Sequence, residues 1–209
     1  MKQKANNFQM MRELGYYQQA AIAAALLERM LPNYQLFAEV TEFGDAKLCR
    51  DILNMVWEWL FVRRVKINFE RLAEELELAT PDQANFDVFG VFPAIDTATA
   101  LDTMLNGISS QDAAEFINVA KISQATVARL IEWEAEELDI SSEAELKKHV
   151  RDHELMQYEM DCLAELIELV RPIQSFEKND VQQLKAWVKE QGLTNLGMEF
   201  SSENNQSDQ

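Results

Sequence analysis

Apolar side chains recur at three- and four-residue steps along most of the chain, the spacing that predicts α-helices. Met10, Leu14, Tyr17 and Ala21 follow this spacing near the N-terminus. Gly15 interrupts the pattern, so we expect a short first helix and a longer second one. The many alanines that follow would let another helix approach the second one closely.

The same spacing predicts further helices, separated by residues that commonly begin or end a helix. Pro32 suits the first turn of a new helix. Asp45 and Asn68 are expected to cap the N-termini of two more, and Gly192 to end the last one. Beyond the first short piece, the expected helices cover residues 16–31, 33–41, 46–62, 69–79, 93–107, 111–138, 151–170 and 180–191, with a short helical turn after Ser142.

The helix expected at 46–62 is apolar almost all round at its C-terminal end. A helix of this kind is usually central and buried. Strand patterns, internal repeats and domain linkers are absent from the sequence. We therefore predict an all-α fold, a single compact domain of about eight to ten helices over residues 1–200. Residues 201–209 carry no core-forming side chain and are expected to be a disordered polar tail.

The connection before the helix at 93–107 is unusually apolar for a loop. This Phe-rich segment, residues 86–93, places a phenylalanine at every third position and also contains a glycine and a proline. A helical turn would set the three rings on one face. We predict a structured plug with at least two of its rings buried against the core, near Trp57 or Trp59.

The net charge of the chain limits the kinds of partner that it can bind. The chain has 19 Lys plus Arg against 36 Asp plus Glu, a formal net charge of −17. This charge disfavours nucleic acid and anionic membrane surfaces as direct ligands, because both require clustered basic side chains. The apolar run at 20–27 is far shorter than the ~20 residues of a membrane span, and no secretory signal is visible. A cytoplasmic protein is expected.

Several short strings resemble the YjaG-like family, a bacterial group of domains of unknown function. The resemblance covers most of residues 16–200. It implies an all-α cytoplasmic fold and supplies no activity. The strings are ERMLPNY (28–34), FGD (43–45), Ile52 with Trp57, NF (68–69), FDVFGVFPAID (86–96) and NLGMEF (195–200).

Acidic residues provide the candidate chemistry. Glu58 lies beside Trp57 on an apolar helix, and a buried carboxylate there would need a partner and would have a raised pKa. Together with Asp87 and Asp96 these residues define a candidate pocket beside the Phe-rich segment. The alternative is that Asp45 caps a helix and the other acids face solvent or form salt bridges. The candidate partners for Glu58 are Arg50, Arg63 and Arg64.

The histidines and cysteines are weaker candidates for a metal-binding or catalytic site. His149 and His153 have the i, i+4 spacing that can chelate a divalent metal. The chain has only two histidines and this pair lies in a charged stretch, so we expect a solvated helix end with no metal and no cofactor. Cys49 and Cys162 have neither a metal-type spacing nor a histidine nearby, and we expect buried, unreactive thiols in a reducing compartment.

A run of seven acids without Lys or Arg covers residues 132–145. It is either a solvated helix end or a docking patch for a basic partner. The sequence FVRRVK at 61–66 offers a patch of opposite sign, within one molecule or across a dimer.

Phosphate-binding loops, dinucleotide fingerprints and a serine nucleophile elbow are absent from the sequence. Two classes of function remain. The first is a non-catalytic protein that acts through protein–protein interaction or self-association. The second is an enzyme or small-ligand binder with an acidic pocket beside residues 86–93. The missing motifs favour the first class, and whether the protein is an enzyme stays open.

Overall fold

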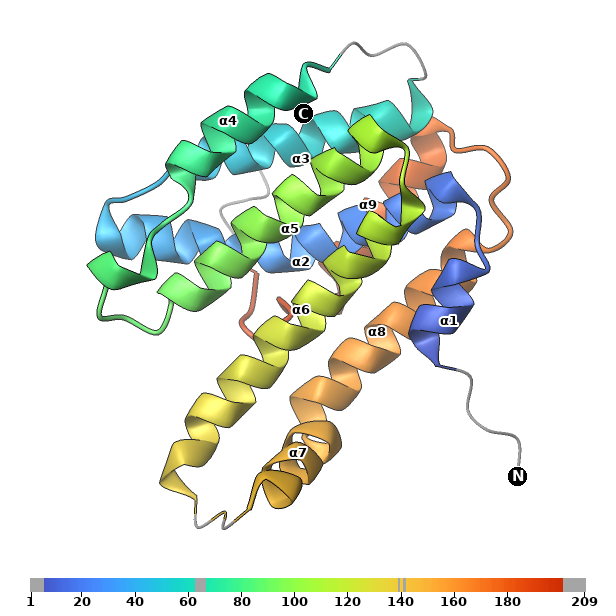
Figure 1. Ribbon diagram of the computed structural model, residues 1–209. Coiled ribbons are helices and arrows are strands. Elements are labelled where there is room, and N and C mark those ends of the chain that lie inside the picture. The colour runs from blue at the N-terminus through green and yellow to red at the C-terminus, as the bar shows by residue number, and fades with distance from the viewer. Residues whose placement is uncertain (1–5, 63–66, 139, 141, 201–209) are drawn as a thin grey trace, which may run out of the picture.

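The computed structural model describes residues 6–62, 67–138, 140 and 142–200 (Figure 1). Within these residues the chain is all-α, as predicted, with nine α-helices and one isolated bridge between Leu193 and Glu199. The predicted tail at 201–209 and most of the basic sequence at 61–66 lie outside the described residues. The helices are α1 (Asn7–Arg12), α2 (Tyr16–Thr41), α3 (Ala46–Phe61), α4 (Phe69–Ala79), α5 (Val91–Ser110), α6 (Ala113–Glu134), α7 (Glu143–Asp152), α8 (Glu154–Val170) and α9 (Lys178–Gln191), with short 3₁₀ turns at Gln83–Asn85 (η1) and Ala135–Glu137 (η2).

Helix α2 is the centre of the fold (Figure 1). Every side chain from Ala20 to Leu27 is buried, and α3, α5, α6, α8 and α9 all pack against the helix. Its alanines leave room for neighbours on several sides, as expected. The prediction that the helix at 46–62 would be central is wrong, because α3 buries one face and exposes residues such as Asn54 and Glu58 on the other.

The predicted break at Pro32 is also wrong, since α2 continues through this residue to Thr41. A proline inside a helix removes one backbone hydrogen bond and is unfavourable. Tyr34 and Phe37 lie beyond the proline and are both buried. The Tyr34 hydroxyl donates to the Ala79 carbonyl at 2.5 Å. Burial of these side chains therefore continues the helix where the local signal alone would end it.

The caps predicted at Asp45, Asn68 and Gly192 are observed. The carboxylate of Asp45 accepts from the backbone N–H of Leu48, and Asn68 caps α4 in the same way. Helix α6 ends at Glu134, earlier than predicted, and continues as the 3₁₀ turn η2. Helix α5 begins at Val91 and runs past Gly107 to Ser110.

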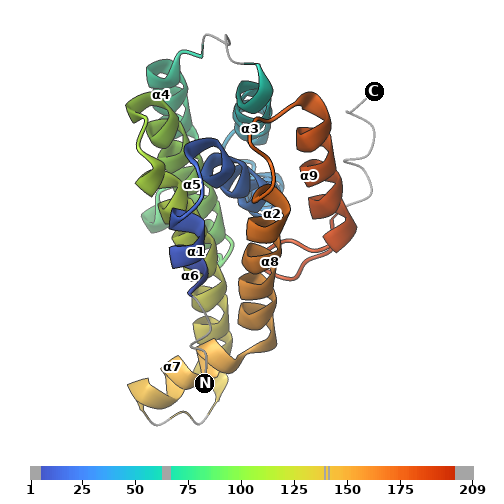
Figure 2. The same ribbon diagram turned by 90° about the vertical axis from the view of Figure 1, so that its right-hand side faces the viewer.

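The C-terminal half of α6 and the N-terminal half of α8 project together from the body of the molecule, and α7 lies across their ends (Figure 2). This projection has a small apolar core of its own, formed by Val127, Ile131 and Met156. Leu196, from the segment after α9, packs against it. The C-terminal segment thus joins the projection to the body.

The Phe-rich segment lies elsewhere than predicted. All three rings are half-buried, and their aromatic neighbours differ from the expected Trp57 and Trp59. The buried positions at the start of α5 are Val91, Pro93 and Ala94. The ring of Phe92 lies beside these positions in helical spacing, and Phe89 lies in the turn before α5. The rings pair as Phe86 with Phe37 and Phe43, and Phe89 with Phe92 and Trp133.

Candidate functional site

The four residues of the predicted pocket have different surroundings. Trp57 is 2% exposed and its indole N–H donates to Glu28 at 2.7 Å. Arg50, one of the partners proposed for Glu58, instead makes two hydrogen bonds to the Glu28 carboxylate, at 2.7 and 2.9 Å. Arg63 and Arg64 lie outside the described residues. Trp57 therefore belongs to a contact between α2 and α3.

The three acids of that pocket are also separate in their contacts. Glu58 and Asp87 are exposed, whereas the Asp96 side chain is 15% exposed. Asp96 accepts a hydrogen bond from Thr126 and lies 3.7 Å from the Arg129 Nε. In the part of the chain that the structure describes, no hydrogen bond or ion pair joins any two of the four predicted residues.

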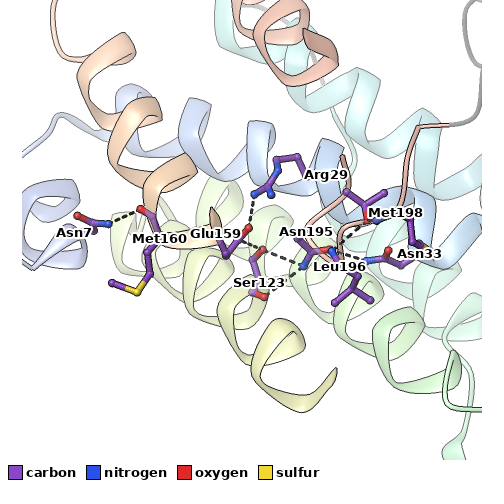
Figure 3. Close-up of polar contacts among 10 residues, drawn as sticks. Asn7, Arg29, Asn33, Ser123, Glu159, Met160, Asn195, Leu196 and Met198 are labelled. Atoms are coloured by element: carbon purple, nitrogen blue, oxygen red, sulfur yellow. Dashed lines mark hydrogen bonds and ion pairs between the residues drawn. The ribbon is translucent and has the colours of Figure 1, made fainter. Parts of the chain in front are cut away.

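A buried polar cluster that the sequence reading missed lies at the centre of the molecule (Figure 3). Arg29 of α2 forms an ion pair with Glu159 of α8, and both side chains are almost completely buried. Ser123 of α6 donates to the other oxygen of Glu159 at 2.6 Å. Asn195 of the C-terminal segment donates to the Ser123 hydroxyl at 3.3 Å and accepts from Asn33 at 2.8 Å.

The cluster leaves some polar atoms without a protein partner. These atoms are Nε and Nη2 of Arg29, Oδ1 of Asn33 and the Tyr158 hydroxyl, all buried. The Tyr158 ring lies 5.2 Å from the Arg29 guanidinium carbon. Burial lowers the pKa of Arg29, but the adjacent Glu159 carboxylate more than offsets this effect, and the pKa is raised. The guanidinium therefore stays charged and fixes the ion pair.

This cluster joins four parts of the chain and is closed to solvent. Arg29, Ser123, Glu159 and Asn195 are each 1% exposed or less. A serine hydroxyl that donates to a buried carboxylate resembles an activated nucleophile, but here a substrate has no route to it. We interpret the cluster as a structural link between α2, α6, α8 and the C-terminal segment.

Two of the strings that carry the family resemblance meet in this cluster. The backbone N–H of Asn195, in NLGMEF, donates to the Arg29 carbonyl in ERMLPNY at 3.2 Å. A second pair of strings meets at Tyr34, whose hydroxyl accepts from the backbone N–H of Asp45, in FGD, at 3.1 Å. A Cβ at Gly44 would lie 2.4 Å from that hydroxyl, and the residue has a φ of +95°. These residues therefore have structural roles.

The surface offers a different set of side chains where α5 begins and α6 ends. Three contacts join α6 to α5 and to the turn before it, in antiparallel order: Thr126 with Asp96, Arg129 with Phe92 and Trp133 with Phe89. The Arg129 guanidinium carbon lies 5.0 Å from the centre of the Phe92 ring. The Trp133 and Phe89 rings are 4.7 Å apart and inclined by 30°. We call Phe89, Phe92, Arg129 and Trp133 the aromatic face.

The aromatic face is accessible, unlike the buried cluster. Trp133 is 51% exposed and the Arg129 side chain 45% exposed, while Phe89 and Phe92 are half-buried. Asp96 borders this face, and burial raises the pKa of its carboxyl above the usual 3.8, although Thr126 and Arg129 act in the opposite direction. Exposed carboxylates surround Trp133 along the chain: Glu132, Glu134, Glu136 and Glu137.

The remaining predicted residues form no comparable site. The rings of His149 and His153 are 5.7 Å apart, and the Nδ1 of His153 accepts from the backbone N–H of Leu155. Among the described residues no group of three or more His, Cys, Asp or Glu could hold a metal ion. Cys49 and Cys162 are free and buried, as predicted, and burial raises the pKa of the Cys49 thiol to about 12.

Comparison with known proteins places the chain in a family. The family described as "Protein of unknown function (DUF416)" matches residues 6–199. A protein of Haemophilus influenzae described as uncharacterized is 35% identical over 192 residues, which are 91% of this chain and 95% of that one. The uncharacterized protein YjaG of Escherichia coli is 33% identical over 191 residues, 91% of this chain and 94% of its own length.

The fold is similar to a solved structure as well. The crystal structure of a DUF416 family protein from Shewanella baltica superposes with a TM-score of 0.86 at 34% identity, covering 94% of this chain and 100% of that one. None of the helices in the described ranges is long and apolar enough to cross a membrane. The resemblance predicted from the short strings is confirmed, and the chain belongs to the DUF416 family.

Proposed function

We propose that this protein acts in the cytoplasm by binding another protein through the aromatic face, and that it is not an enzyme. The observation that carries the proposal is Trp133, a half-exposed indole stacked on Phe89. Exposure of an indole ring to water is unfavourable in free energy. Trp and Arg side chains often supply much of the binding free energy of protein interfaces. Arg129 supplies the second of these side chains on the same face.

Charge and burial support this proposal over the alternatives. The net charge of −17 disfavours nucleic acid and anionic membranes as partners. The hydroxyl of Ser123, the side chain that most resembles a nucleophile, is enclosed in the buried polar cluster. Contact with Phe89 restrains the Trp133 side chain, so that less side-chain entropy is lost on binding.

A second candidate is a small-ligand site at Asp96. Its carboxyl has a raised pKa, is 15% exposed and lies beside the Arg129 guanidinium. Carboxyls of this kind occur at functional sites more often than elsewhere. The two candidates differ in the residue that they require, since a ligand site depends on Asp96 and a protein interface depends on Trp133.

The test uses four forms of the full chain: wild type, Trp133→Ala, Asp96→Asn and Leu169→Ala. Leu169 is 41% exposed and lies on α8, so its variant is a matched loss of exposed apolar surface away from the aromatic face. Each form is immobilised, and proteins retained from an extract of the source cell are quantified by mass spectrometry. Binding of each candidate is then repeated with purified partner.

We expect a purified partner that binds the wild type and Leu169→Ala equally and Trp133→Ala at least tenfold more weakly. Sedimentation of the chain alone at several concentrations includes a second copy among the partners. Equal binding by all four forms would refute the role of the aromatic face. A loss of protein binding with Asp96→Asn and not with Trp133→Ala would refute the role of Trp133 and place the contact at Asp96.

A further inference from the structure

In the aromatic face, a cation covers the ring of Phe92, but no cation of the described residues covers the exposed side of Trp133. One ring of the aromatic face, Phe92, is covered by a cation of the chain itself, Arg129 at 5.0 Å. Trp133 has Phe89 against one side, and it is still 51% exposed. Within the described ranges no Lys or Arg lies over the Trp133 ring. Indole attracts cations more strongly than the other aromatic rings do.

Apart from Arg129, which lies one helical turn before it, the charged side chains near Trp133 in the sequence are all acidic. From 130 to 146 the sequence contains no Lys or Arg. The four exposed glutamates nearest to the indole in sequence are Glu132, Glu134, Glu136 and Glu137, and none of them forms an ion pair with a described residue. Asp87 is exposed as well, two residues before Phe89. Unpaired carboxylates around an aromatic ring create a negative potential that attracts cations and repels anions.

We infer that the partner presents a lysine or arginine side chain to Trp133, from a basic segment whose other charges meet the surrounding glutamates. This inference rests on the proposed function and names the chemistry of the partner. The cation would lie over the indole as Arg129 lies over Phe92. An acidic partner would be repelled, and a purely apolar one would leave the carboxylates desolvated and unpaired.

The test uses blocked alanine-based peptides of equal length that carry four arginines, four lysines or four glutamines at the same positions. Affinity for the folded full-length protein and its variants is measured by titration calorimetry. In the wild type, NMR locates the contact through the indole N–H signal of Trp133, which Trp133→Phe identifies by removing it. We expect the arginine and lysine peptides to bind and to shift this signal, and the glutamine peptide to do neither.

Three variants separate a cation–π contact from general attraction to an acidic protein. Trp133→Leu keeps an apolar side chain and removes the ring, and should weaken binding of the arginine peptide by about three- to thirty-fold. Trp133→Phe should fall between leucine and the wild type. Leu138→Ala is the matched control, because Leu138 is also 51% exposed and lies in the same acidic stretch. It should bind within about twofold of the wild type.

The inference is overturned if Trp133→Leu binds the arginine peptide as the wild type does, because binding would then come from charge alone. It is also overturned if the glutamine peptide binds equally well, because the contact would then be apolar. If no peptide binds but a captured partner still depends on Trp133, the inference about a cation is overturned and the proposed function is retained. Capture that is indifferent to Trp133 refutes the proposed function itself.

Discussion

Replacing Glu159 with leucine would test the buried polar cluster. The substitution leaves the Arg29 guanidinium, which is 0% exposed, without its counter-charge. It also removes the acceptor of the Ser123 hydroxyl, now 2.6 Å away. Breaking a buried ion pair from one side typically costs about 3–5 kcal/mol, because the remaining charge stays buried and unpaired. That loss is a large part of the roughly 5–15 kcal/mol that stabilises a domain.

Urea unfolding followed by circular dichroism at 222 nm measures this free energy directly. For a chain of this size the same loss corresponds to a fall in melting temperature of roughly 6–20 °C. Glu75→Leu is the control, because it breaks the exposed i, i+4 pair with Arg71 by the same substitution. Its expected cost is at most about 0.5 kcal/mol.

The double variant Arg29→Met, Glu159→Leu separates charge from packing. Replacing a buried ion pair by apolar side chains of similar size is often neutral or stabilising. We expect the double variant to recover at least half of the stability that Glu159→Leu loses. A single variant within about 1 kcal/mol of the wild type would contradict the reasoning. So would a double variant that is no more stable than the single one.

Two further predictions concern separate sites. Gly44→Ala should unfold at a lower urea concentration than Gly192→Ala, although both glycines have positive φ angles. Only at Gly44 would the new Cβ meet another residue, the Tyr34 hydroxyl at 2.4 Å. Equal unfolding midpoints would show that backbone strain alone decides the effect. A ¹³C NMR titration should place the pKa of the Asp96 carboxyl above 3.8, and Thr126→Val should raise it further by removing a hydrogen bond that favours the carboxylate. Since the raised pKa means that the folded state favours the protonated form, the contribution of Asp96 to stability should be present at low pH and be lost as the pH rises through its folded value. A midpoint at or below 3.8 would contradict this account.

Most of the fold can be predicted from local features of the sequence. The caps at Asp45 and Asn68 and the inner faces of the helices were predicted because they depend on nearby residues alone. The break predicted at Pro32 is absent because other helices bury Tyr34 and Phe37, and this burial outweighs the tendency of proline to end a helix.

The sites were harder to predict than the fold. Glu159 occupies an inward position of a helical pattern between Met156 and Met160, and Arg29 interrupts an apolar run, so two opposite charges on inner faces were a usable sign of the buried pair. The contact of Trp133 with Phe89 joins a position on α6 to one in the turn before α5, and helical spacing within one segment carries no information about such a contact.

The position of Asn195 after helices α2, α6 and α8 in the sequence bears on the order in which the cluster forms during synthesis. Translation delivers α2, α6 and α8 before the residue whose side chain and backbone complete their polar cluster. Until Asn195 has emerged from the ribosome, the Asn33 amide and the Arg29 carbonyl lack partners that they have in the finished fold. A nascent chain therefore cannot complete this cluster until residue 195 has left the ribosome. A chain that stops at residue 192 should be digested by proteases much faster than one that includes Asn195, because it lacks the residue that completes the cluster.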